Sequence, residues 1–218
     1  MLTFSEENHL KSIFHLSSES ESGVSTNSIA DNLNTKASSV TEMLKKLNDK
    51  LLIVYKKYRG AQLTEKGRKT ALNIIRKHRL WEVFLVDKLN FKWDEVHDIA
   101  EQLEHIQSEK LTNELDKFLN FPTKDPHGDP IPNPAGFIKF TPKLKLSDLN
   151  IGETGKFVGV KDSSATFLKY LDKRQISLGS NIKVLHQEEF DQSLHVGLDE
   201  SNLTISIKTA SNLYITKI

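Results

Sequence analysis

Apolar side chains recur at helical spacing over residues 4–47. Residues 4–17 form the first such stripe, and a polar, serine-rich stretch follows it. Ser25 or Thr26 can cap the next short helix, and residues 34–37 turn the chain into a second one. Two short helices about a tight turn predict a helix-turn-helix. The apolar positions of this pair are Ile29, Ala30, Leu33, Val40, Met43, Leu44 and Leu47.

A two-stranded hairpin is predicted next, because the pattern changes to β-branched and aromatic residues. The stretch LLIVYKKY at residues 51–58 predicts one strand, the dipeptide RG turns the chain, and AQLT can return as a second strand. Helical spacing resumes over residues 65–119, with an interruption near NFKW. This order predicts a winged helix followed by a second helical block.

The helical block ends in a proline-rich connector. Five of the six prolines fall within residues 122–134, where they cannot continue a helix. Short β-like runs separated by Gly, Asp or Asn then occupy residues 144–218 and predict a small β-barrel of about 75 residues. The fold class expected from these patterns is α+β.

The cysteine count limits the chemistry of any site. With no cysteine in 218 residues, disulfides, thiolate chemistry and cysteine-ligated zinc or iron–sulfur sites are excluded. A metal site must therefore be built from oxygen and imidazole nitrogen. The sequence has no leader-like start and no apolar run long enough to span a membrane, so a cytoplasmic location without membrane association is expected.

The net charge of +1 conceals two oppositely charged regions. From Met43 to Arg79, twelve basic residues stand against two acidic ones, a balance of +10. From Leu80 to Asn120, ten acidic residues stand against four lysines, a balance of −6. This asymmetry favours an anionic polymer as the partner of the first region and cations as the partners of the second. Ordinary solvated faces are the alternative that charge alone leaves open.

The basic region spans the second helix of the helix-turn-helix and the hairpin, which favours double-stranded DNA as its partner. Small and hydroxyl side chains at the start of that helix can meet base edges and phosphates, and basic side chains of the hairpin can contact the DNA backbone. A winged helix used for protein contacts is the alternative. The candidate DNA-binding residues are Ser25, Thr26, Lys36, Ala37, Ser38, Ser39, Thr41, Glu42, Lys45, Lys56, Lys57 and Arg59.

The acidic region contains possible metal ligands within WDEVHDIAEQLEHIQSEKL, residues 93–111. If this segment is one helix, four of its polar side chains share an arc about 100° wide beside the buried face. An upstream helix repeats the arrangement with His78 and Glu82, four residues apart. Such a set resembles a divalent-cation site, and the alternatives are a solvated face or a minor di-iron interpretation. The four residues of the arc are His97, Glu101, Glu104 and His105.

Together, these motifs resemble the metal-dependent repressors of the DtxR/MntR type. ASSVTEMLKKL and YKKYRGAQLTEKGRKTA resemble the family's recognition helix and wing, RKHRLWEVFL and EVHDIAEQLEH its two metal-helix motifs, and DPHGDPIP its connector. The resemblance covers the whole chain. It implies a winged helix-turn-helix DNA-binding domain at residues 1–74, a helical metal-binding and dimerisation domain with a proline-rich connector at 75–143, and an SH3-like, FeoA-type β-barrel at 144–218.

The resemblance also implies two metal sites. The primary site would use Glu101, Glu104 and His105 and be completed from the first helix. The ancillary site would use His78, Glu82 and His97. Iron-responsive members commonly have Cys at the position of Glu101 and manganese-responsive members have Glu, which favours Mn(II) with Fe(II) as the alternative. Hard oxygen ligation suits Mn(II) on chemical grounds as well.

The first helix departs from the family pattern at two positions. Asn8 stands where the manganese branch has Asp, and it still offers a carbonyl oxygen. Lys11 stands where some members have Glu, and its charge would repel a second cation. Glu7 and His9 are the alternatives to Asn8. From the C-terminal segment, Asp162 is the candidate ligand.

The function implied is Mn(II)-dependent or Fe(II)-dependent repression by a homodimer on an inverted-repeat operator, in the control of metal-ion homeostasis and without an organic cofactor. Predicted dimer contacts are Leu80, Phe84, Leu111, Leu115 and Phe118. A metal-independent winged-helix regulator and a helical metallohydrolase are the competing classes. The sequence has no nucleophile–base arrangement and no Gly-rich phosphate loop, so no enzyme is expected.

Overall fold

The computed structural model describes residues 2–17, 23–56, 59–139, 142–198 and 201–218. The chain divides into two compact units. The first contains Met1–Trp81, Ala100–Phe121 and Ile131–Ile138, and the second contains Glu82–Ile99, Pro122–Pro130 and Lys139–Ile218. No helix in the described ranges is both long and apolar enough to cross a membrane.

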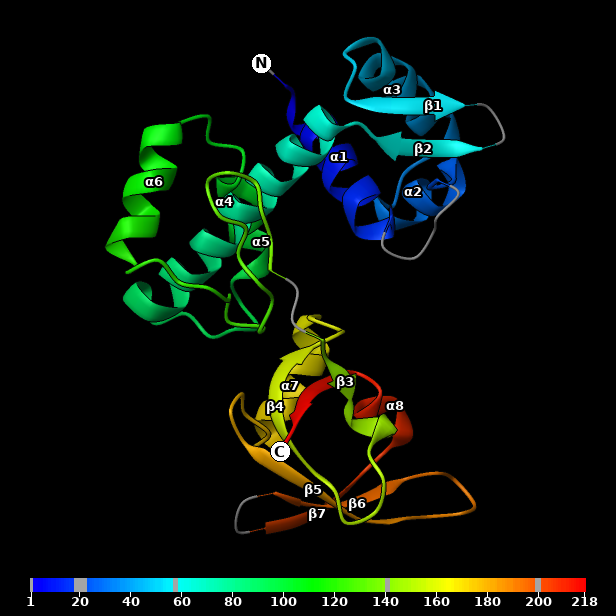
Figure 1. The fold of residues 1–218 in the computed structure, drawn as a ribbon, viewed down its shortest axis with the longest axis vertical. Helices are drawn as coiled ribbons and strands as arrows, with labels where there is room; N and C mark the ends of the chain where they lie inside the picture. Colours follow the sequence, from blue (N-terminus) through cyan, green and yellow to red (C-terminus); the bar gives the residue numbers. More distant parts are fainter. Residues whose placement is uncertain (1, 18–22, 57–58, 140–141, 199–200) are drawn as a thin grey trace. The chain divides into compact units, whose positions relative to one another are not determined.

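The N-terminal part of the first unit is a winged helix-turn-helix, as predicted (Figure 1). The two strands pair antiparallel, with Ile53 opposite Leu63. Ser25 caps the second helix, since its side-chain oxygen accepts a hydrogen bond from the backbone N–H of Ser28 at 3.0 Å. The elements are α1 (Phe4–Ser17), α2 (Thr26–Asn32), α3 (Ala37–Asp49), β1 (Ile53–Lys56) and β2 (Gly60–Leu63).

The core of this part is made by the apolar positions that repeat at helical spacing. Leu10 and Ile13 of α1 are fully buried and belong to the same cluster as residues of α2, α3 and the hairpin. The next helix begins close to this cluster, because a Cβ at Gly67 would lie 1.8 Å from the carbonyl oxygen of Leu52. Only glycine allows such an approach of the two backbones. The buried members from α2 and α3 are Ile29, Ala30, Val40, Leu44 and Leu47.

The helical block contains α4 (Glu65–Leu89), α5 (His97–Leu103) and α6 (Glu109–Phe118). The expectation of one helix through residues 93–111 is wrong, because α5 ends at Leu103. A turn follows, in which the N–H of Ile106 bonds to the carbonyl of Leu103 at 3.2 Å. Ser108 then caps α6 through the N–H of Leu111, and this cap starts a separate helix. Glu104 and His105 therefore lie just beyond α5.

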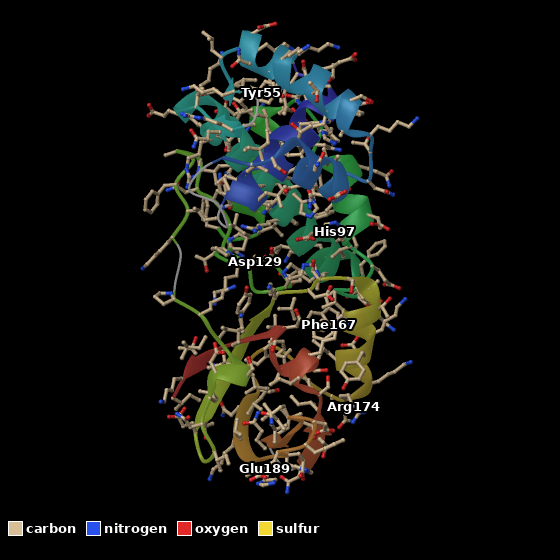
Figure 2. The ribbon with its side chains drawn as sticks, turned by 90° about the vertical axis from the view of Figure 1, so that its right-hand side faces the viewer. Tyr55, His97, Asp129, Phe167, Arg174 and Glu189 are labelled. Atoms are coloured by element: carbon tan, nitrogen blue, oxygen red, sulfur yellow. The ribbon has the colours of Figure 1, made fainter. Side chains whose placement is uncertain are left out.

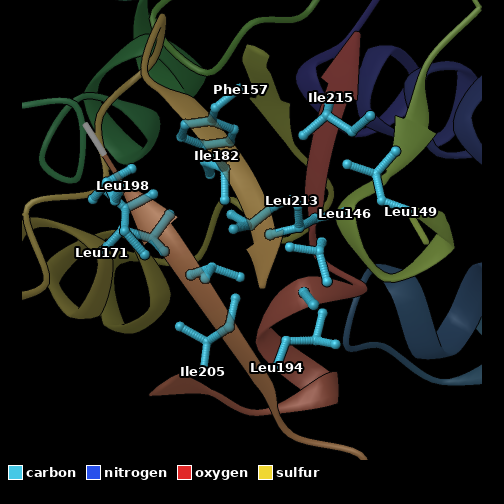
Figure 3. Packing of buried hydrophobic residues seen from close by; sticks show 14 of the residues in the cluster. Leu146, Leu149, Phe157, Leu171, Ile182, Leu194, Leu198, Ile205, Leu213 and Ile215 are labelled. Carbon is cyan, nitrogen blue, oxygen red and sulfur yellow. The ribbon is translucent and has the colours of Figure 1, made fainter. Parts of the chain in front are cut away.

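The C-terminal part of the second unit is a six-stranded antiparallel sheet in the order β3-β8-β4-β5-β6-β7. Apolar side chains of the strands and of two helices form its buried core, and Phe157 is the largest of the fully buried ones (Figure 3). The elements are β3 (Leu144–Lys145), η1 (Leu146–Asp148), β4 (Thr154–Val160), α7 (Ala165–Lys173), β5 (Asn181–Gln187), β6 (Leu194–Leu198), β7 (Ser201–Ile205), α8 (Ile207–Ala210) and β8 (Leu213–Lys217).

The two helices of this part were not predicted from the sequence. Each begins at a serine whose side chain accepts a backbone N–H: Ser164 accepts from Phe167 at 3.4 Å, and Ser206 accepts from Thr209 at 3.1 Å. Leu168 of α7 is fully buried in the core. The sequence thus contains capping serines for both helices and helical apolar spacing in α7. They were overlooked because strand-like patterns surround them.

Candidate DNA-binding surface and metal-binding sites

The start of α3 presents an exposed polar surface. The side chains of Lys36, Ser38 and Ser39 are exposed, whereas Ala37 and Thr41 are half-buried. The hydroxyl of Thr41 donates to the carbonyl of Ala37 at 2.9 Å, so it is used within the helix. Among the other candidates, the exposed residues are Ser25, Glu42 and Lys45, and Thr26 is half-buried.

The hairpin, which follows α3 in the sequence, presents basic side chains. Lys56 and Arg59 are exposed, and with Gly60 they help to line a hollow of about 150 Å³. Tyr55 of β1, labelled in Figure 2, is held by its backbone N–H, which donates to the side chain of Asn48 at 3.0 Å. This bond ties the hairpin to the end of α3. Lys57, also predicted to bind DNA, lies outside the described residues.

Residues of α1, α4, α5 and the turn after α5 form a first cluster, the Lys11 site. The ammonium nitrogen of Lys11 lies 2.9 Å from Oε1 of Glu101 and 2.7 and 2.9 Å from the two carboxylate oxygens of Glu104. Glu104 is fully buried, while the side chain of Glu101 is half exposed. A lysine therefore lies between two of the three predicted primary ligands. The site consists of Glu7, Lys11, His78, Glu101, Glu104 and His105.

The histidines of the Lys11 site also contact carboxylates. Nδ1 of His78 lies 2.6 Å from Oε2 of Glu104, and Nδ1 of His105 lies 2.6 Å from Oε2 of Glu7. The side-chain amide of Gln107 donates to the other oxygen of Glu7 at 2.5 Å. Glu7, an alternative ligand in the sequence reading, is thus hydrogen-bonded by two side chains of the α5–α6 connection.

In the Lys11 site, neighbouring groups counteract the effect of burial on the pKa of Glu104. Burial raises the pKa of Glu104, but the hydrogen bond from His78 and the charge of Lys11 outweigh it, and the pKa lies below the usual value. Burial also lowers the pKa of Lys77, against the opposing charges of Glu7 and Glu104. Glu104 is therefore held ionised although it is inaccessible to water.

The two remaining predicted ligands of α1, Asn8 and His9, make no hydrogen bond to the carboxylates of the Lys11 site in the described part of the chain. Oδ1 of Asn8 is buried and accepts no hydrogen bond from the described residues. His9 bonds through Nδ1 to the carbonyl of Ser5 at 2.6 Å, and burial lowers its pKa. In the C-terminal part, Oδ1 of Asp162 accepts the backbone N–H of Ser164 at 2.9 Å.

A second cluster, the Glu82 cluster, lies in the second unit and consists of Glu82, Asp125 and His127. All three side chains are buried, and each offers a ligand atom within 4.8 Å of the others. Nδ1 of His127 lies 3.6 Å from Oε1 of Glu82. His97, labelled in Figure 2, approaches the same oxygen at 3.6 Å. Two buried carboxylates and an imidazole therefore converge on one point.

The ligand atoms of this cluster are oriented by the backbone. Nε2 of His127 donates to the carbonyl oxygen of Trp93 at 2.8 Å, which turns Nδ1 towards Glu82. Oδ1 of Asp125 accepts the backbone N–H groups of His127 and Asp129 at 2.8 and 2.9 Å. Such outer hydrogen bonds fix the tautomer of a ligating histidine and the direction of a ligating carboxylate.

The same contacts control the protonation of His127. Burial would lower the pKa of its imidazole, but the hydrogen bond and charge of Glu82 and the charge of Asp125 raise it to about 9. A proton on Nδ1 therefore balances part of the carboxylate charge, and a metal ion would have to displace it. This donor set of hard oxygens and one imidazole fits Mn(II) or Fe(II).

The sequence analysis missed two members of the Glu82 cluster. Asp125 and His127 lie in DPHGDPIP, which was interpreted only as a connector. The spacing Asp-x-His before a glycine was the available signal. The predicted ancillary set of His78, Glu82 and His97 combines residues of both units and remains a prediction.

A winged helix-turn-helix followed by a helical segment with clustered carboxylates and imidazoles defines a class, the winged-helix regulators with a metal-binding domain. The comparison with known families gives three matches in the same order. Residues 1–61 match "Iron dependent repressor, N-terminal DNA binding domain" and residues 64–133 match "Iron dependent repressor, metal binding and dimerisation domain". Residues 144–217 match the FeoA domain.

Individual relatives agree with these matches. The iron-dependent repressor IdeR of Mycobacterium tuberculosis is 37% identical over 126 residues, which are 58% of this chain and 54% of that protein. IdeR of Mycobacterium leprae is 32% identical over 179 residues, 82% of this chain and 69% of the relative. A solved manganese-dependent transcriptional repressor in complex with manganese has a TM-score of 0.88 and 34% identity, covering 98% of this chain and 100% of that one.

The chain belongs to the iron-dependent repressor family, also called the DtxR family. It spans about half the length of the M. tuberculosis relative, with 54% covered. The predicted resemblance and the three-part α+β fold class are confirmed. The family consists of DNA-binding repressors and not of enzymes, which agrees with the expectation of no catalysis and removes the metallohydrolase alternative.

Proposed function

We propose that the chain is a Mn(II)-dependent transcriptional repressor that binds an inverted-repeat operator as a cytoplasmic homodimer and controls metal-ion homeostasis. The observation that carries the proposal is the Glu82 cluster, whose two buried carboxylates and oriented imidazole converge within 4.8 Å. Two buried carboxylates beside each other are costly without a cation. A divalent ion would supply that charge and join α4 to the turn that carries His127.

Two observations favour Mn(II) over softer ions. The sequence contains no cysteine, so the ligands are limited to oxygen and imidazole nitrogen, which suit Mn(II). A solved relative with a TM-score of 0.88 is named as a manganese-dependent repressor in complex with manganese. Fe(II) is the second candidate, because other relatives are named iron-dependent and Fe(II) lies next to Mn(II) in ligand preference.

The proposed DNA contacts combine the start of α3 with the hairpin. Ser38 and Ser39 are exposed where a recognition helix meets base edges, and Lys36 is exposed at its N-cap. Lys56 and Arg59 supply charge for the phosphate backbone. The remaining proposed contacts are Ser25, Thr26, Ala37, Thr41, Glu42, Lys45 and Lys57.

The proposed switch is a coupling free energy between metal binding at the Glu82 cluster and DNA binding by the winged helix. Glu82, Asp125 and His127 come from α4 and from the connector, so one ion restricts how these segments move with respect to each other. If the restricted arrangement is the one that fits DNA, ion binding and operator binding strengthen each other by the same factor. His97 lies 3.6 Å from Oε1 of Glu82 and is the proposed fourth ligand of the cluster.

A selection experiment tests the proposal without knowledge of the operator. The full chain is used to enrich duplexes from a random-sequence library in Mn(II), and the affinity for the enriched duplex is measured by fluorescence anisotropy with Mn(II), Fe(II) or a chelator. Enrichment of an inverted repeat, with binding lost in chelator, is expected. Glu82→Gln should bind weakly in all three conditions. Glu188→Gln, a substitution at an exposed glutamate that follows β5, should behave as the wild type.

The result also separates the alternatives. Equal binding in metal and in chelator would support a metal-independent winged-helix regulator. Stronger binding with Fe(II) than with Mn(II), measured under anaerobic conditions, would support the iron-dependent alternative.

A further inference from the structure

We propose that the ammonium group of Lys11 is the permanent cation of the Lys11 site, so that α1 is joined to Glu101 and Glu104 without a metal ion. This inference depends on the proposed function in one respect: the metal ion bound by each chain is assigned to the Glu82 cluster. It differs from the sequence expectation, which made Glu101, Glu104 and His105 the primary metal ligands.

The bonding capacity of the ammonium group is filled. A lysine has three N–H donors, and Nζ of Lys11 has three carboxylate oxygens within hydrogen-bonding distance, at 2.9, 2.7 and 2.9 Å. The side chain is only 13% exposed, and one of its two partners, Glu104, is fully buried. Charge-assisted bonds of this length are the strong kind, so Lys11 is firmly held.

Both carboxylate oxygens of Glu104 that a metal would need are already bonded. Oε1 of Glu104 accepts from Lys11, and Oε2 of Glu104 contacts both Lys11 and Nδ1 of His78. His105 directs Nδ1 towards Glu7 and has Nε2 at 4.0 Å from Oε1 of Glu104. A metal ion could bind here only after the lysine moved out of a largely buried position.

Two lysines offset two of the three carboxylate charges of the site without a metal. Glu7, Glu101 and Glu104 supply three negative charges to the site. Lys11 supplies a positive charge in direct contact, and the buried Lys77 supplies another that acts on Glu7 and Glu104. A divalent ion would add two further positive charges close to Lys11, where like charges repel.

Asn8 supplies no negative charge that could offset the charge of an added metal ion. Its side chain is a neutral amide, so it adds an acceptor oxygen but no negative charge. The two clusters therefore differ in kind. The Glu82 cluster has two buried carboxylates and ligand atoms that converge on one point. In the Lys11 site, the ammonium group of Lys11 already bonds the carboxylates that a metal ion would bind.

The consequence is a contact that does not depend on metal supply. Leu10 and Ile13 on either side of Lys11 belong to the core of the winged helix, so α1 is a rigid part of that domain. Lys11 then fixes the segment around Glu101 and Glu104 to this domain in the presence and in the absence of Mn(II). The metal signal enters through the Glu82 cluster alone.

Metal stoichiometry tests the inference directly. The full chain is dialysed to equilibrium against Mn(II), and bound manganese per chain is measured by atomic absorption. The expected values are one ion for the wild type, two for Lys11→Gln, and one for the charge-preserving control Lys11→Arg. The additional ion of Lys11→Gln should disappear in the double variant Lys11→Gln/Glu104→Gln.

Two results would overturn the inference. The first is loss of the bound ion when Glu101 is changed to Gln, a substitution at a half-exposed side chain whose folding is checked by circular dichroism. The second is a folded Lys11→Gln variant that binds no additional ion. Failure of the proposed function is a different result, namely a wild-type chain whose manganese content does not change on Glu82→Gln.

Hydrogen exchange of α1 gives an independent measurement in chelator. The backbone amides of α1 in the wild type and in Lys11→Arg should be equally protected. Those of Lys11→Gln should exchange faster in chelator and regain protection in Mn(II). Unchanged protection of Lys11→Gln in chelator would show that the lysine is not what holds α1, and would overturn that part of the inference.

Discussion

Nδ1 of His127 lies 3.6 Å from Oε1 of Glu82, although the two residues are far apart in the sequence. The opposite ring nitrogen donates to the carbonyl of Trp93, so the imidazole has one orientation. Glu82 and Asp125 together raise the pKa of His127 from 6.5 to about 9, against the effect of burial. This relationship makes both stability and metal binding depend on pH.

In chelator, the unit that contains His127 should lose stability as the pH rises. The folded pKa lies above the unfolded value of 6.5, so the stabilisation is fully present below pH 6.5 and is lost as the pH rises through about 9. A shift of this size corresponds to roughly 3 kcal/mol at most. Urea unfolding at pH 6.5 and 9.5, followed by Trp93 fluorescence in a Trp81→Phe background, measures it. Parallel pH profiles for this protein and its His127→Gln variant would contradict the prediction.

The turn after His127 should tolerate only glycine. Gly128 has φ +86°, and a Cβ there would lie 2.1 Å from the carbonyl oxygen of Val158. Gly128→Ala should therefore displace the turn, cost roughly 1–3 kcal/mol, and weaken Mn(II) binding at the Glu82 cluster. Isothermal titration with Mn(II) and urea unfolding measure the two effects.

Gly152 provides the matched control. Its φ of +91° is similar, but a Cβ there would have nothing within 4 Å. Gly152→Ala should therefore show only the backbone cost of roughly 1 kcal/mol and retain wild-type Mn(II) affinity. Equal loss of Mn(II) affinity in both variants would mean that the clash at Gly128 does not control the cluster.

The hairpin should contribute charge and not sequence readout. Arg59→Ala is expected to weaken binding to all duplexes similarly and to reduce the slope of log affinity against log salt by about 1. Anisotropy titrations over a range of salt concentrations, on the enriched duplex and on a scrambled one, measure both. Lys208→Ala, a substitution at an exposed lysine of α8, should leave the slope unchanged. An unaltered slope in Arg59→Ala would remove the hairpin from the interface.

The dimer contact should involve the exposed apolar face of α6. Among the predicted contacts, Leu80 and Leu115 are buried within the chain and offer no surface, whereas Leu111 is 40% and Phe118 59% exposed. The segment matches a family described as a dimerisation domain. Phe118→Lys should shift the chain from dimer to monomer in light scattering coupled to size exclusion. Phe190→Lys, at a fully exposed phenylalanine outside that segment, should leave the dimer intact.

The parts of the fold that the sequence predicted well are those set by local pattern. The helix-turn-helix follows from helical spacing on either side of residues 34–37, and the hairpin follows from β-branched residues around a glycine. The break after Leu103 was missed because apolar spacing continues across it through Ile106. The cap at Ser108 decides the boundary, and such capping signals are common in sequences.

The candidate sites were predicted less completely, because they depend on contacts between distant segments. Asp125 and His127 acquire their role only from Glu82, which no periodicity relates to them. Lys11 was recognised as a departure that would repel a second cation. Its position between Glu101 and Glu104 could not be read from spacing, because Lys11 is 90 and 93 residues from them in the sequence.

Lys11 has a consequence for the shape of the response to metal. A side chain cannot be chelated, exported or exchanged, so a site that it fills adds no step to the binding curve. A chain that binds one ion has no cooperativity of its own, and any steepness must come from the pairing of two chains on DNA. Replacing Lys11 with a neutral residue would therefore convert a graded sensor into one with two dependent inputs per chain.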